Sequence, residues 1–167
     1  MTLHAFAEWL SQTPLSLTIQ NVAWIIPTVQ TIHILSIAIV VSSVFMVDLR
    51  LLGVIGRDQP TAAYTSRFLS WIWPTLAVLA VTGAILITGE PPRSLENPAF
   101  QTKMVLLILA MITTAVLQRP TFKDPAYWEL TSGHRNSARA LAVVSLCLWV
   151  GIVFAGRWIA YMNVSGD

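Results

Sequence analysis

The chain has 167 residues, of which 55% are hydrophobic and only 11% are charged, and its mean hydropathy is +0.67. A soluble domain of this size needs more charged surface, so the composition indicates an integral membrane protein. The net charge is +2, but the basic residues are scattered and form no stripe, which excludes a nucleic-acid partner. A single cysteine, Cys147, excludes a disulfide framework or a Cys-based metal centre within one chain.

Residues 2–12 are expected to form a short amphipathic helix at the membrane interface. Apolar residues recur there at helical spacing, with His4 and Glu8 on another side: Leu3, Phe6, Ala7 and Leu10. A signal peptide would begin with basic residues, and residues 1–19 contain no Lys or Arg, so we expect this segment to be retained. Thr13 and Pro14 are expected to end the helix.

Four apolar segments follow, at about residues 22–47, 68–88, 102–117 and 138–161, joined by short loops rich in Gly and Pro. A helix needs about 20 apolar residues to cross a bilayer core, and these segments are near that length. They predict one all-α domain, a transmembrane four-helix bundle preceded by the interfacial helix. With these boundaries the span interiors hold no Asp, Glu or Lys, and Asp48 and Arg50 anchor the inner end of the first span.

Lys and Arg are unevenly divided between the two sides of this predicted bundle. Seven of the ten lie in the first and third loops, and three lie in the second loop or near the outer ends of spans. Because basic loops stay on the cytoplasmic side, both termini are expected on the opposite side.

His33 is the titratable residue in the interior of the first span. It lies twelve residues beyond Asn21, about 18 Å along a helix and therefore near mid-membrane. A polar ring at that depth must find a partner away from lipid, which marks a candidate functional site. Three interpretations are open: a hydrogen-bonded packing residue, an axial ligand of a b-type haem, or a member of a proton relay. The lack of a second titratable group in the spans counts against the relay.

A haem b on His33 would need cations for its propionates and a second axial ligand. Arg157, about one turn inside the fourth span, and Lys103, at the start of the third, both lie on the outer side of His33. Each is otherwise an interfacial residue that contacts lipid headgroups. Met111 is the candidate sixth ligand at a similar depth, although methionines mostly fill core gaps, and five-coordinate iron is the alternative.

The other histidines lie outside the spans. His134 is expected in a solvated inner loop, about 22 Å from the level of His33 along a helix. His4 could ligate the haem only from an inward-folded helix or a neighbouring subunit. His4 and Glu8, one turn apart, could instead begin a copper or zinc site, which His33 or an oligomer would have to complete.

Three motifs then carry a family resemblance: VDLRLLG at 47–53, NPAFQTKM at 97–104 and GRWIAY at 156–161. With the histidine-bearing first span, they resemble a family of small bacterial four-span membrane proteins of unknown function, over most of the chain. The chain is also loosely similar, in size and span count, to the cytochrome b561 and superoxide-oxidase group of small membrane cytochromes. Those proteins hold two haems on several span histidines, whereas only His33 lies on a span here. The resemblance implies the bacterial inner membrane, where the charge distribution places both termini on the periplasmic side.

The leading hypothesis is a membrane cytochrome that holds haem b on His33. It would pass single electrons between a quinone or redox partner protein and an acceptor on the outer side, and we expect a homo-oligomer in the lipid bilayer. One alternative is a non-enzymatic scaffold or accessory subunit in which His33 only packs. Another is a copper-binding or transport protein that uses His4, Glu8 and His33. No hydrolytic site is expected, because the spans hold no carboxylate pair and no Ser-His-Asp set at one depth.

Overall fold

The computed structural model describes residues 2–124, 126–159 and 161, and these residues form helices and connecting turns without a β-strand. The elements in chain order are α1 (Leu3–Ser11), α2 (Pro14–Asn21), α3 (Ile25–Leu51), α4 (Thr61–Gly89), α5 (Pro91–Leu95), α6 (Pro98–Lys123), the 3-10 helix η1 (Tyr127–Glu129) and α7 (Ser132–Trp158). Four of them, α3, α4, α6 and α7, are long and apolar enough to span a membrane. The predicted all-α four-helix membrane bundle is confirmed, and the chain is by this measure a multi-pass membrane protein.

Local sequence signals set several helix ends. Asn97 caps α6, because its Oδ1 accepts a hydrogen bond from the backbone N–H of Ala99 at 2.9 Å, and Pro98 occupies the first helical position. Thr131 caps α7 in the same way, accepting from the backbone N–H of His134 at 3.2 Å. Beyond the end of α3, Gly53 adopts a φ of +76°, a left-handed conformation that favours glycine.

The helix boundaries differ from those of the predicted apolar segments. α6 begins at Pro98 rather than 102 and continues through Pro120, and α7 runs over 132–158 rather than 138–161. α4 begins at Thr61 rather than 68, and α3 covers 25–51 rather than 22–47. Position 160 of the predicted fourth span lies outside the described residues. The first helix does end before Thr13 and Pro14, as expected, but this pair also starts a second short helix, α2, which Thr13 caps.

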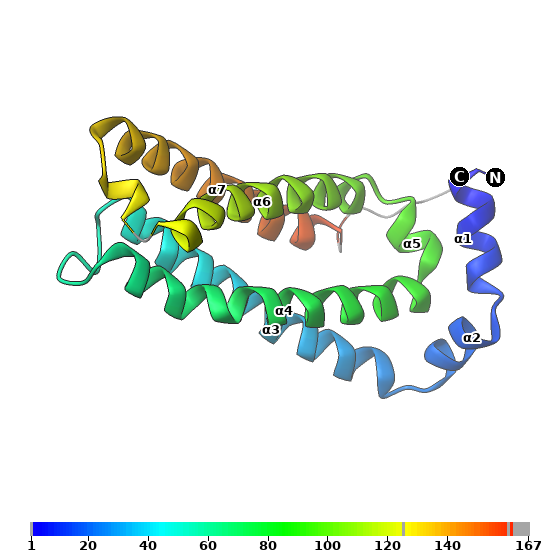
Figure 1. Cartoon of the computed structure of the whole chain (residues 1–167). Coiled ribbons are helices and arrows are strands. Elements are labelled where there is room, and N and C mark those ends of the chain that lie inside the picture. The colour runs from blue at the N-terminus through cyan, green and yellow to red at the C-terminus, as the bar shows by residue number, and fades with distance from the viewer. Residues whose placement is uncertain (1, 125, 160, 162–167) are drawn as a thin grey trace.

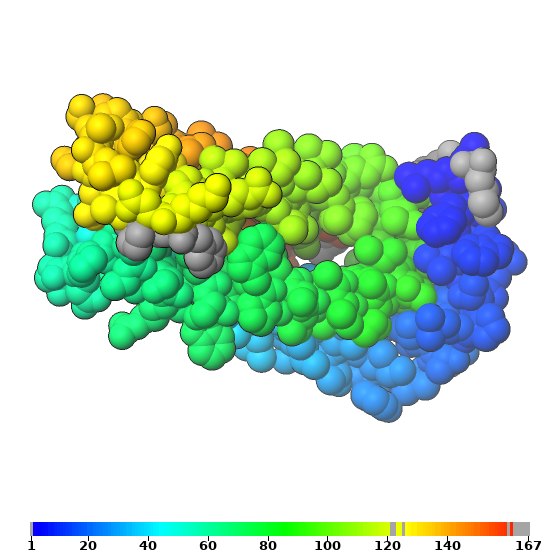
Figure 2. Space-filling model, in the orientation of Figure 1, coloured from blue at the N-terminus to red at the C-terminus, as the bar shows by residue number. Residues whose placement is uncertain are grey.

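The long helices form two antiparallel hairpins, α3 with α4 and α6 with α7 (Figure 1). The hairpins meet chiefly where α3 packs against α7, and the apolar core gathers in the half of the bundle near the α3–α4 and α6–α7 connections. We call this half the loop end. At the opposite end, the capped end, α1, α2 and α5 lie across the hairpins (Figure 1). In Figure 2 the face between α4 and α6 is hollowed toward the capped end.

Candidate functional site

His33 on α3 reaches across to α4, where its Nδ1 lies 2.7 Å from Thr82 Oγ1. The Thr82 hydroxyl has one proton, and its oxygen lies 2.7 Å from the carbonyl oxygen of Val78, to which it donates. Thr82 therefore accepts from His33, which places the imidazole proton on Nδ1 and leaves a lone pair on Nε2. Nε2 has no hydrogen-bond partner within the described residues. Such a hydrogen bond on one ring nitrogen is how proteins orient a histidine that binds a metal through the other.

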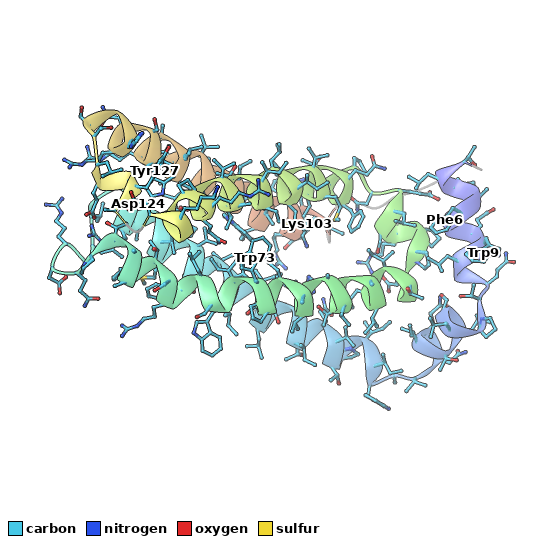
Figure 3. All side chains as sticks on the ribbon, viewed as in Figure 1. Phe6, Trp9, Trp73, Lys103, Asp124 and Tyr127 are labelled. Atoms are coloured by element: carbon cyan, nitrogen blue, oxygen red, sulfur yellow. The ribbon has the colours of Figure 1, made fainter. Side chains whose placement is uncertain are left out.

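The His33 ring is partly buried, close to the backbone of α4. A Cβ added at Gly83 would lie 3.6 Å from His33 Cε1, at ordinary van der Waals distance, which shows that the ring lies against α4 at Gly83. Lys103 on α6 is close enough to act on His33 through its charge. Figure 3 shows the Lys103 side chain in the space between the two hairpins. His33 and Lys103 are therefore the candidate site residues of the two hairpins, one from each.

Lys103 is a partly buried cation that makes no salt bridge to a carboxylate in the described part of the chain. Its side chain lies along α7, where a Cβ added at Gly156 would be 3.6 Å from Nζ. The expectation that the span interiors hold no lysine was wrong, because α6 begins at Pro98 and places Lys103 more than one turn inside the helix. An ammonium group in an apolar bundle favours an anionic partner, so this pair of residues suits a ligand with an apolar body and a carboxylate.

Arg157 and Met111 are the other two residues predicted to contact a haem. Arg157 is exposed at the capped end, where its Nη2 donates to the Tyr161 hydroxyl at 2.7 Å and its guanidinium lies 5.0 Å from the centre of the Tyr161 ring. Met111 is 36% exposed. Gln118, seven residues or two helical turns later on α6, accepts a hydrogen bond from Trp73 of α4. Met111 therefore lies on the side of α6 that turns toward α4. A role for either residue in cofactor binding stays a prediction.

His4 and Glu8 do come together, and Glu96 joins them. His4 Nδ1 lies 2.7 Å from Glu96 Oε1, and this contact connects α1 to the end of α5. Within α1, His4 Nε2 lies 3.4 Å from Glu8 Oε1. The hydrogen bond to Glu96 raises the pKa of His4 above its ordinary 6.5, and the negative charges of Glu8 and Glu96 add to the effect. His4 is exposed, and its ring is engaged by these carboxylates rather than turned into the bundle.

His33 is not part of this surface group, so the predicted copper ligand set of His33, His4 and Glu8 is not assembled. Among the described residues, no group of three or more His, Cys, Asp or Glu side chains is placed to hold a metal ion. The expectation that His134 lies in a solvated loop was wrong: it lies in the first turn of α7 near the loop end, and its partly buried ring stacks on Tyr127 with the ring centres 4.4 Å apart.

The sequence prediction missed a buried carboxyl. Asp48 was expected to anchor the end of the first span beside Arg50, but it lies inside α3 and is only 1% exposed. Arg50 instead lies 3.8 Å from Glu129 of η1 and donates to the Gln59 carbonyl at 2.6 Å. The missed signal is spacing: Asp48 lies four residues after Val44, on the apolar face of α3 that forms the core.

The fold and the site define a four-span helical membrane protein with an oriented histidine on one hairpin and, on the other, a lysine that pairs with no carboxylate among the described residues. The model of DUF6644, a family of unknown function, matches residues 6–162, so the chain belongs to that family. Neither the curated proteins nor the solved structures give a match to the chain. The resemblance to a family of unknown function is thus confirmed, and no similarity to the cytochrome b561 group is shown.

Proposed function

We propose that this protein is a membrane cytochrome that binds a b-type haem through Nε2 of His33. The observation that carries the proposal is the hydrogen bond from His33 Nδ1–H to Thr82, which leaves Nε2 unprotonated as a ligand must be. Haem iron, when bound, supplies one-electron chemistry, while the protein supplies its ligand, its orientation and its electrostatic surroundings.

Lys103 supports the choice of haem over a bare metal ion. A single histidine is a poor site for a free ion, and the described residues add no further ligand group. A haem needs only one or two protein ligands and carries two carboxylates, so an unpaired ammonium from the opposite hairpin is a suitable partner. Met111 would be the second protein ligand of the iron; without it, His33 alone would hold the haem.

The electron donor is proposed to be a quinone or a redox partner protein, with the acceptor on the capped-end side. Two features of the described residues are relevant. The lipid-facing surfaces of the four long helices carry many exposed aliphatic side chains, which suits an apolar donor or a second copy of the chain. The distribution of Lys and Arg favours the bacterial inner membrane with both termini on the periplasmic side.

The test is an optical spectrum of detergent-purified protein from haem-replete cells, recorded oxidised and then reduced with dithionite. We expect a Soret band that sharpens and shifts on reduction in the wild type and is lost in His33→Ala. The matched control is His134→Ala, which removes a histidine of the loop end and should leave the band intact. Colourless wild-type protein would refute the cytochrome and favour the scaffold or accessory subunit, in which His33 only joins α3 to α4.

A further inference from the structure

A second polar cluster lies inside the loop-end half of the bundle, and the proposed haem site does not use it. It consists of Asp48 on α3, Thr114 and Gln118 on α6, and Ser145 on α7, and we call it the Asp48 cluster. All four residues are more than nine-tenths buried, with Asp48 and Ser145 each 1% exposed. They line a cavity of about 10 Å³ whose remaining walls are aliphatic: Val44, Val47, Leu69, Ile72 and Leu117.

Five polar side-chain atoms of the Asp48 cluster have no hydrogen-bond partner within the described residues. They are both carboxylate oxygens of Asp48, Thr114 Oγ1, Gln118 Nε2 and Ser145 Oγ. Hydroxyls elsewhere in the spans behave differently, since that of Thr113 donates to the Leu109 carbonyl at 2.8 Å. Buried polar atoms are nearly always satisfied in folded proteins, so five around one small cavity indicate a polar guest.

The directions of the donors and acceptors identify the guest. Trp73 Nε1–H donates to Gln118 Oε1 at 2.8 Å, which fixes the amide and leaves Nε2–H as the free donor. The Thr114 hydroxyl is another free donor, and the Ser145 hydroxyl lies beside the Asp48 carboxyl, the acceptor of the group. A metal cation in the cavity would face the amide N–H of Gln118, whereas a water molecule both accepts and donates.

We propose that the Asp48 cluster binds one water molecule, which accepts from Gln118 Nε2 and Thr114 Oγ1 and donates to the Asp48 carboxyl. A cavity of this volume holds about one water, and a buried water needs two to four polar partners. In the proposed arrangement the Ser145 hydroxyl turns to donate to the second oxygen of the same carboxyl, so that all five atoms gain a partner. The site joins α3 of one hairpin to α6 and α7 of the other, at the end of the bundle where the hairpins meet.

The sign of a stability change tests the proposal. If a water occupies the cavity, Thr114→Val removes one of its partners and should lower the Tm of the detergent-purified protein by about 3 °C. If the cavity is dry, the same change removes an unsatisfied hydroxyl and should raise the Tm instead. Thr113→Val is the matched control, because that hydroxyl already bonds within its own helix, and its Tm should change less than that of Thr114→Val. A Tm raised by Thr114→Val overturns the proposal.

A spectroscopic measurement identifies the guest independently of stability. In wild-type protein labelled with ¹⁵N-glutamine, the side-chain amide that disappears in Gln118→Met should show a rotating-frame Overhauser cross-peak to water. The absence of this cross-peak overturns the proposal. So does a Tm that rises in sodium chloride relative to choline chloride and loses that rise in Asp48→Asn, since the guest would then be a sodium ion.

Discussion

Thr82→Val is the substitution that isolates the orientation of His33. Valine has nearly the shape of threonine, so the change removes the hydroxyl that accepts from Nδ1 at 2.7 Å and leaves the packing of a side chain that is 6% exposed. A buried donor that loses its partner costs about 1–3 kcal/mol, which corresponds to about a 5-fold to 160-fold change in an equilibrium constant. Loss of an outer hydrogen bond to a ligating histidine typically weakens metal binding by about 10- to 100-fold. We therefore expect haem affinity to fall by about 10-fold or more.

The assay is a haem titration of the apoprotein, followed at the Soret band, for the wild type, Thr82→Val and Thr82→Ser. Serine keeps the hydroxyl and should retain an affinity within about 3-fold of the wild type. Equal affinities for the wild type and Thr82→Val would show that Thr82 does not prepare Nε2, and the reasoning behind the haem proposal would fail. A weakened Thr82→Ser would point to packing rather than to the hydrogen bond.

Three further predictions concern His4 at the capped end, Lys103, and the contact between α4 and α6. Because Glu96 and Glu8 raise the pKa of His4, the contact of His4 with Glu96 stabilises α1 fully below a pH of about 6.5 and is lost as the pH rises through the raised pKa. Hydrogen exchange of the α1 amides, corrected for its intrinsic pH dependence, should accelerate over that pH range. His4→Gln should remove this acceleration. Lys103→Met should weaken haem binding by about 10-fold, from loss of a charge-assisted hydrogen bond, while Lys103→Arg should largely preserve it, as read from Soret titrations. Trp73→Phe removes the 2.8 Å bond to Gln118 between α4 and α6 and should lower the Tm by about 2–4 °C, whereas an unchanged Tm would mean that the bond contributes nothing to hairpin docking.

The helices themselves could be predicted well because their information is local. Hydropathy located all four spans, since a bilayer-length apolar helix needs no knowledge of its neighbours. The boundaries were missed where capping overrode apolarity: Asn97 and Thr131 start α6 and α7 in polar sequence that a hydropathy window discards. Thr13 was taken as an interruption because Pro14 ends a preceding helix, yet the same pair also begins the next one.

The site could be predicted only in part because it depends on contacts between distant segments. Depth alone singled out His33, but its partner Thr82 is 49 residues away, and sequence spacing cannot show which α4 hydroxyl meets it. The burial of Asp48 was missed because its position in the sequence suggested the membrane surface. A carboxylate at the end of an apolar run usually marks the membrane surface, and only the packing of α6 and α7 reveals that this one faces inward.

The hollow between α4 and α6 opens on the flank of the bundle rather than at one of its ends (Figure 2). In a membrane, a flank faces acyl chains, so a guest could pass into this space directly from the bilayer without crossing bulk water. A lateral opening of this kind would admit molecules that dissolve in lipid, and Lys103 on the α6 side would then bind those that carry a negative group. If the protein binds haem as proposed, the hollow would thus serve as a lateral entrance from the bilayer, and its width would limit the size of the ligand that enters.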